Sequence, residues 1–257
     1  MNAIDTHAHL DHVENVEQAL KEAAEAGVEA VVAVGSDLAS NQKNLAIKRS
    51  TVKPKIYLGL GIHPGNIKAE ELESTYKFIR ENIAEASAIG EIGLDFWYKW
   101  VRKDKEKHEQ QRRVFLKQLE FAKEFDLPAV IHTRGTWREC LETTQKVGVK
   151  KAVFHWYSGP VDVLKDIIAA GYFVSCSPSV ARSPQSREAM THAPIEHTLI
   201  ETDCPVFYRT GEGDEGFQAT PKHVFKTLEA YCALKNLKEP DALPILNRNA
   251  KSFFNMT

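Results

Sequence analysis

The chain has 257 residues, of which 43% are hydrophobic and 26% charged, which suits one large soluble domain or two small ones. Its formal net charge of −2 argues against a protein that clamps long duplex nucleic acid, because such proteins usually present a strongly basic face. Any nucleic-acid substrate is therefore expected to be held locally, at an end or as a short piece.

Two features of the sequence bear on the compartment. It contains no apolar run of about eighteen residues, so no membrane span is expected, and its start lacks the basic and apolar blocks of a signal peptide. The four cysteines are far apart and form no C-x-x-C pair, which predicts reduced, mostly buried thiols. We therefore expect a cytoplasmic protein, and nothing in the sequence calls for an obligate protein partner.

Short apolar runs rich in β-forming residues predict eight strands, at 3–6, 30–34, 56–62, 88–92, 129–132, 152–155, 173–175 and 198–201. Helical periodicity separates most of them and predicts helices at 16–26, 70–84, 109–125, 136–146, 161–170, 222–235 and 240–254. Strands that alternate with helices pair in parallel, because each crossover passes over one face of the sheet.

Eight such units within this length predict an α/β fold, a (β/α)8 TIM barrel that forms a single domain over residues 1–257. The alternative is an open, doubly wound sheet. No glycine-rich phosphate loop follows the first strand, which favours the barrel.

The ends of the predicted strands carry metal-ligand side chains. His7 and His9 lie two residues apart at the end of an extended segment, so both imidazoles project to one side. In a barrel of this kind the carboxyl ends of all strands meet on one rim, where function gathers. The strand ends contribute four histidines and two carboxylates to that rim: His7, His9, Glu91, His132, His155 and Asp203.

Six ligands are too many for one tetrahedral zinc ion, and they suit two metal ions that share a carboxylate. The two N-terminal histidines would bind one ion, and His132 with His155 the other. Glu91 is expected to bridge the ions, and Asp203 to complete the first site beside a water molecule. Imidazole and carboxylate ligands are compatible with zinc, manganese or magnesium.

The chain resembles the TatD family of metal-dependent hydrolases, among the amidohydrolase-type barrels. The matching segments follow the family order over essentially the whole chain: Asp5-Thr6-His7-Ala8-His9-Leu10-Asp11, Gly61-Ile62-His63-Pro64, Gly90-Glu91-Ile92-Gly93-Leu94-Asp95, Glu109-Gln110, Leu127-Pro128-Ala129-Val130-Ile131-His132-Thr133-Arg134, His155 before Ser158-Gly159, and Glu201-Thr202-Asp203. Two segments depart from it. Trp156-Tyr157 stands where the family more often has Cys-Phe, and Gln218-Ala219-Thr220-Pro221 where an Arg/Asn-Pro type motif is usual.

The resemblance implies a two-metal barrel with deoxyribonuclease-type phosphodiesterase activity, often acting from 3′ ends of DNA. It assigns the same six residues as metal ligands and places His63 near the substrate. The departure at 218–221 weakens any transfer of phosphate-binding residues in the loop after the eighth strand.

Roles for individual residues follow from this chemistry. Two cations can lower the pKa of a water molecule and neutralise charge on a phosphoryl oxygen, and Asp203 is expected to accept the proton of that water. His63 could contact a phosphate or a leaving group, or it could be a structural residue held by Pro64. Arg134 could bind a phosphate in bidentate fashion or form a surface salt bridge.

Aromatic residues at 96–98, 100 and 156–157 could stack on the bases of a single strand or pack against the barrel rim. The leading hypothesis is a deoxyribonuclease of the 3′-end exonuclease type. The alternative is an esterase or amidase on the same metals, such as an aminoacyl-tRNA deacylase. Related barrels with that chemistry often bridge their metals with a carboxylated lysine, whereas this chain has Glu91 there. A binding module without catalysis is the third hypothesis, and the intact ligand set argues against it.

Overall fold

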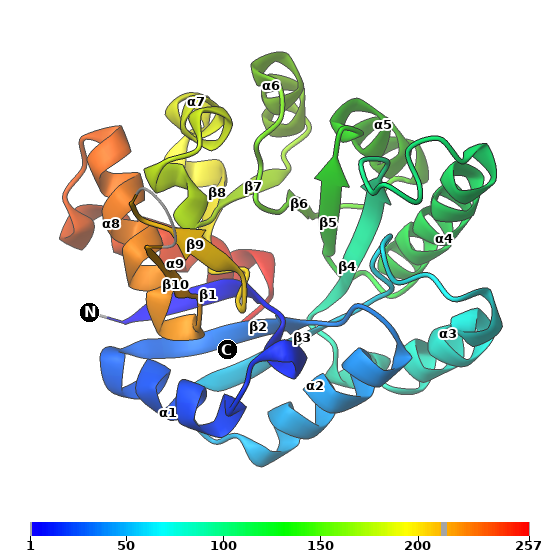
Figure 1. Cartoon of the computed structure of the whole chain (residues 1–257), viewed down its shortest axis with the longest axis horizontal. Helices are drawn as coiled ribbons and strands as arrows, with labels where there is room; N and C mark the ends of the chain where they lie inside the picture. Colours follow the sequence, from blue (N-terminus) through cyan, green and yellow to red (C-terminus); the bar gives the residue numbers. More distant parts are fainter. Residues whose placement is uncertain (1, 212–214, 257) are drawn as a thin grey trace.

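The computed structural model describes residues 2–211 and 215–256. In this part of the chain, one sheet of eight parallel strands follows the sequence order, and helices surround it (Figure 1). The strands are β1 (Ala3–Ala8), β2 (Val28–Val34), β3 (Lys55–Leu60), β4 (Ala88–Asp95), β5 (Ala129–Arg134), β6 (Ala152–Phe154), β7 (Phe173–Cys176) and β8 (Thr198–Ile200). The predicted (β/α)8 TIM barrel is confirmed.

The helices are α1 (Val16–Ala26), α2 (Leu38–Ser50), α3 (Leu72–Glu81), α4 (Lys105–Glu124), α5 (Trp137–Val147), α6 (Val161–Ala169), α7 (Pro184–His192), α8 (Val224–Lys235) and α9 (Glu239–Phe253). The sequence predicted all of them except α2 and α7. Helix α1 ends as expected at Gly27, whose φ of 100° is left-handed and suits a residue without a Cβ.

Helix α2 escaped prediction because its buried face is polar. Asp37 caps it by accepting a hydrogen bond from the Ser40 N–H at 2.9 Å. Asn41 and Asn44 are both fully buried, and their amides donate to the Gly61 and Val34 carbonyls at 2.7 and 2.9 Å. The helix is therefore fixed to the barrel rim by hydrogen bonds, and apolar periodicity cannot reveal it.

Apolar side chains fill the barrel at the end opposite the strand carboxyl ends. Ile4, Val32, Val130 and other strand residues form a buried cluster with Phe253 and Phe254, at the end of α9. Burying a phenylalanine in this way contributes roughly 1.5–3 kcal/mol. The end of the C-terminal helix therefore covers the barrel at the end opposite the strand carboxyl ends. The candidate active site lies at the carboxyl ends.

The barrel closes between β1 and the segment after β8. The Asp203 N–H donates to the His7 carbonyl at 3.0 Å, and the His9 N–H donates to the Cys204 carbonyl at 2.8 Å. Ala8 and Cys204 form a parallel bridge at the same place. Closure thus places Asp203, the last of the predicted ligands in the sequence, beside His7 and His9, the first two.

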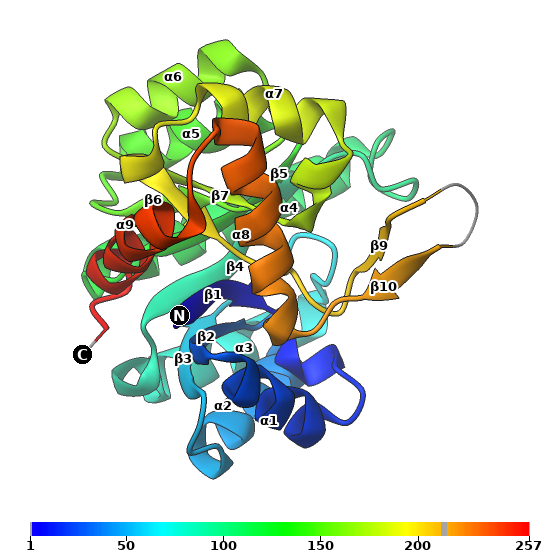
Figure 2. The same ribbon diagram turned by 90° about the vertical axis from the view of Figure 1, so that its left-hand side faces the viewer.

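A short antiparallel hairpin, β9 (Phe207–Arg209) with β10 (Gly216–Gln218), stands away from the barrel (Figure 2) and was not predicted. The four cysteines are buried and free, as the sequence predicted. Among the helices of the described residues, none has the length and apolar character that crossing a bilayer requires.

Candidate active site

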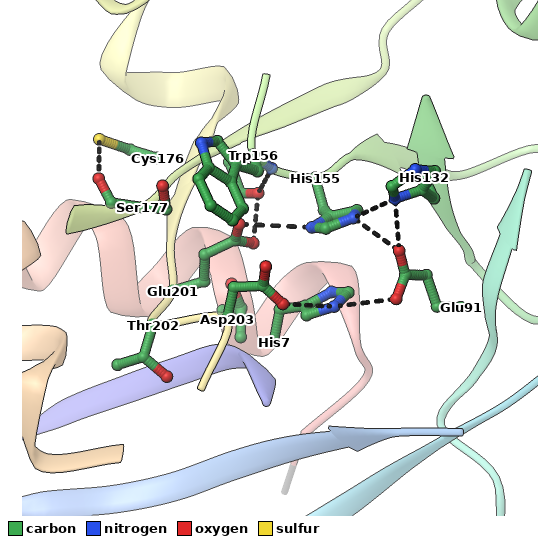
Figure 3. Close-up of polar contacts among 12 residues, drawn as sticks. His7, Glu91, His132, His155, Trp156, Cys176, Ser177, Glu201, Thr202 and Asp203 are labelled. Carbon is green, nitrogen blue, oxygen red and sulfur yellow. Dashed lines mark hydrogen bonds and ion pairs between the residues drawn. The ribbon is translucent and has the colours of Figure 1, made fainter. Parts of the chain in front are cut away.

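Glu91 lies at the centre of the strand-end cluster, at the middle of β4, with 1% of its surface exposed. Its Oε1 is 2.7 Å from Nε2 of His155 and 2.8 Å from Nδ1 of His132. Its Oε2 is 3.1 Å from Nε2 of His9 and 3.4 Å from Nε2 of His7. Each carboxylate oxygen therefore faces a different histidine pair, and Figure 3 shows His132 and His155 on one side of Glu91 and His7 on the other.

Asp203 approaches the same cluster from the segment after β8. Its Oδ1 lies 3.5 Å from Nε2 of both His7 and His9. The backbone of Asp203 has a φ of 47°, an uncommon conformation for a residue with a side chain, and one that clusters at functional sites. The structure thus brings all six predicted residues together.

A buried carboxylate holds the Asp203 segment in place. The N–H and hydroxyl of Thr202 donate to the two oxygens of Asp5 at 2.9 and 2.6 Å. Burial raises the pKa of Asp5 well above its ordinary value, against the lowering effect of these hydrogen bonds. The side chain of Asp5 therefore positions the backbone next to Asp203.

Buried polar atoms without partners test whether these residues fit a metal ion. His7 Nε2, Glu91 Oε2 and Asp203 Oδ1 have no hydrogen-bond partner among the described residues, although leaving a buried polar atom unpaired is costly. His7 Nε2 is 3.4 Å from the glutamate oxygen and 3.5 Å from the aspartate oxygen. Ligand atoms about 2.1 Å from a tetrahedral ion lie about 3.4 Å apart. The spacing and the donor types therefore fit a divalent metal.

Two candidate metal-binding clusters lie at this site. His7, His9 and Asp203 form one, and His63, Glu91 and His132 form another. His63 had been expected near the substrate, and its Nε2 lies 3.6 Å from Glu91 Oε1.

Charges within the cluster favour an ionised carboxylate at its centre. Burial alone would raise the pKa of Glu91, but the charge of His155 and a hydrogen bond with His132 hold that pKa well below its ordinary value. Burial and the charge of His155 lower the pKa of His7, whose ring stacks on that of His155 with centroids 3.9 Å apart. A central anion surrounded by imidazoles is the electrostatic arrangement of a site for cations.

Two further carboxylates hold the outer histidines. Oδ2 of Asp95 is 2.9 Å from Nε2 of His132, and Oε1 of Glu201 is 3.4 Å from Nδ1 of His155. Glu201 also accepts a hydrogen bond from Ser175. Carboxylates of this kind fix the orientation of metal-binding imidazoles. Sequence reasoning assigned them no role, although both belong to the motifs that it had recognised.

Comparison with known proteins identifies the family. The family model described as "TatD related DNase" matches residues 4–255. An uncharacterized metal-dependent hydrolase of Methanocaldococcus jannaschii is 30% identical over 98% of this chain and 96% of its own length. The chain belongs to the TatD family. It is therefore a metal-dependent hydrolase, an enzyme that acts on ester bonds.

Two other TatD relatives are similar to this chain over nearly their full length. Deoxyribonuclease TATDN3 of Homo sapiens is 26% identical over 98% of this chain and 94% of its own. The crystal structure of the TatD homologue YjjV of Escherichia coli K12 superposes with a TM-score of 0.88, at 26% identity and covering 99% of this chain and 98% of the other. The resemblance expected from the sequence is confirmed.

Five of the six candidate ligands line a cavity of about 790 Å³, and His7 is the exception. His9, His63 and Glu91 line it, and so do aromatic side chains of the loops after β4 and β6 and hydroxyl groups near α7. Such a volume is typical of small-ligand pockets, at roughly 300–1,000 Å³. The cavity therefore suits one or a few substrate units.

Arg134 lines this cavity, and its guanidinium already has a partner. Its Nη2 is 2.9 Å from Oδ2 of the fully buried Asp95. The guanidinium carbon of Arg134 lies over the ring of Tyr98, 4.9 Å from the ring centroid. The side chain is still 45% exposed. The salt bridge that we considered for Arg134 is thus present, with a buried partner, and its contact with a substrate phosphate stays a prediction.

Proposed function

We propose that this TatD protein is a deoxyribonuclease, a phosphodiesterase that releases nucleotides from 3′ ends of DNA with the help of two divalent metal ions. The observation that carries the proposal is the division of the Glu91 carboxylate, whose two oxygens face separate histidine pairs at 2.7–2.8 Å and 3.1–3.4 Å. One carboxylate shared in this way is the ligand arrangement of a two-metal hydrolase.

Six side chains would hold the metals: His7, His9, Glu91, His132, His155 and Asp203. Zinc, manganese and magnesium all accept this mixture of donors. When bound, such ions lower the pKa of water and neutralise charge on a phosphoryl oxygen.

In the proposed mechanism Asp203 accepts the proton of the attacking water. Burial raises the pKa of its carboxyl above the ordinary value, although His7 and His9 act in the opposite direction. The place of Asp203 beside the first histidine pair, 3.5 Å from each Nε2, puts it at the floor of the cavity where water would react.

His63 would donate a hydrogen bond to the substrate. Its Nδ1 accepts the Gly65 N–H at 2.9 Å, so the proton of the neutral ring is on Nε2. Burial lowers the pKa of His63 to about 3, which keeps the ring neutral. The Nε2 proton therefore points toward the cavity floor, where it can reach a phosphate oxygen or a leaving group.

One observation favours a second candidate, a hydrolase of a carboxylic ester such as an aminoacyl-tRNA deacylase. Among the described residues that line the cavity, Arg134 is the only arginine, and lysine is absent. A site whose side chains carry so little positive charge could accept an ester that carries no charge at the bond to be cleaved.

The cytoplasmic location and the single-domain organisation stay predictions.

A metal-reconstituted activity panel tests the proposal. Metal-free protein is loaded with zinc, manganese or magnesium and given 3′- or 5′-labelled single- and double-stranded DNA, RNA, a simple phosphodiester and an aminoacyl ester. We expect metal-dependent loss of nucleotides from the 3′ end of DNA. Cleavage of the aminoacyl ester alone would establish the second candidate, and no release from any phosphodiester would refute the first.

A further inference from the structure

We propose that Trp97 is the stacking surface for the base of the terminal nucleotide, so that the enzyme recognises the presence of a base at the strand end. This inference rests on the proposed function and adds a specificity residue to it. Trp97 lies in the loop between β4 and α4 (Figure 1), and its side chain lines the cavity above the metal cluster.

The exposure of Trp97 is unusual for so large an apolar side chain. Of its surface, 63% is accessible to solvent. The other large hydrophobic side chains that are exposed within the described residues are Val52, Trp100, Leu116, Phe207 and Leu237, and they do not line the cavity. An exposed aromatic ring at the wall of a reactive site offers a face on which a planar ligand can stack.

The backbone and one edge of the indole have defined neighbours. The backbone N–H of Trp97 donates to Oδ1 of Asp95 at 2.9 Å. A Cβ placed on Gly135 would lie 2.1 Å from the indole Nε1, so the ring lies directly against a position that has no side chain. Gly135 also has a φ of 78°, where a glycine is favoured. The ring is therefore a preorganised surface and loses little freedom when a ligand stacks on it.

The same carboxylate connects this surface to the metal cluster. Oδ1 of Asp95 accepts the backbone N–H of Trp97, and its Oδ2 lies 2.9 Å from Nε2 of His132. The loop that carries the indole is thus tied to the same buried side chain that contacts a candidate metal ligand. Such positioning is what holding a terminal nucleotide for hydrolysis requires.

Charge in the cavity points to the same mode of binding. The guanidinium of Arg134 is paired with Asp95, so the wall has little positive charge left for substrate phosphates. Stacking on Trp97 supplies affinity without that charge. A base inside a duplex has both faces covered by its neighbours, whereas a terminal base has a free outer face, so stacking on the indole favours a terminal nucleotide.

The test compares single-stranded oligonucleotides with a normal or an abasic 3′-terminal residue, at saturating metal. We expect Trp97→Ala to lower kcat/KM for the normal strand by about 5- to 150-fold. The loss should shrink to within about twofold for the abasic strand, which has no base to stack. Trp97→Phe should restore most of the activity on the normal strand, because it retains an aromatic face.

Trp100→Ala is the matched control, since Trp100 is in the same loop and 55% exposed but does not line the cavity. It should leave the ratio between the two strands unchanged. An equal loss on both strands for Trp97→Ala would assign the residue to loop folding and overturn the inference, as would no loss on either. Wild-type protein that cleaves neither strand refutes the proposed function itself, and this inference with it.

Discussion

The backbone N–H of Asp203 donates to the carbonyl of His7 at 3.0 Å, which joins the last residue of the ligand set to the first. The contact is one of those that close the barrel. It fixes the Asp203 carboxylate beside the N-terminal histidines without help from the side chain itself.

Because this contact uses only the backbone, Asp203→Asn should leave the fold intact while removing the proton acceptor. We expect kcat to fall by about 10²–10⁴-fold, the usual contribution of a general base. Single-turnover hydrolysis of labelled DNA measures the loss, and thermal unfolding checks the fold. Near-normal turnover would remove Asp203 from this role.

Asp95 is predicted to act through His132. Asp95→Asn removes the negative charge 2.9 Å from the imidazole, and a lost partner of this kind typically weakens metal binding by about 10–100-fold. Calorimetric titration of metal-free protein measures the effect. Asp166→Asn is the control, because Asp166 forms an exposed ion pair with Arg138, and neither residue lines the cavity or belongs to a candidate metal-binding cluster of the described residues. Equal affinities for the two variants would contradict a positioning role.

The barrel and the six clustered residues were predictable because each depends on a short pattern. Apolar strand runs alternate with helices, and ligand-type side chains sit at the strand ends. Asp95 and Glu201 were missed because their role depends on which imidazole lies next to them in space. Helix α2 was missed because Asn41 and Asn44 interrupt the apolar side chains of its buried face, and hydrogen bonding to another element leaves no periodic signal.

Removing metal should lower thermal stability. Glu91 Oε2 and Asp203 Oδ1 are buried without hydrogen-bond partners, so a cation that binds only the folded state stabilises it. Metal at a hundred times its Kd adds about 2.7 kcal/mol, which raises Tm by about 5–10 °C in a chain of this size. Differential scanning calorimetry with and without chelator measures the shift. Glu91→Ala should abolish the response to metal, and an unchanged response would argue that metal binds elsewhere.

Gln118 on α4 is predicted to stabilise the segment that leads to His63. Its fully buried amide accepts the Ile62 N–H at 2.6 Å and donates to the Ile62 carbonyl at 3.1 Å. Gln118→Leu leaves both backbone groups unsatisfied, which should cost about 2–4 kcal/mol of unfolding free energy. Urea unfolding measures the loss. The same substitution at the exposed Gln42 should change stability by less than about 0.5 kcal/mol.

Activity on single strands is predicted to depend only weakly on salt. Proteins with 6–10 phosphate contacts lose about 10³–10⁵-fold in affinity between 50 and 200 mM salt. The cavity offers Arg134 as its one arginine among the described lining residues, and that side chain is paired with Asp95. One phosphate contact gives a slope of about −0.7 for a single strand, or about a threefold loss over this range. Measuring kcat/KM at saturating metal across these salt concentrations tests the prediction. A loss beyond about a hundredfold would mean that several cations outside the cavity grip the strand. Stacking would then contribute only a small part of the affinity.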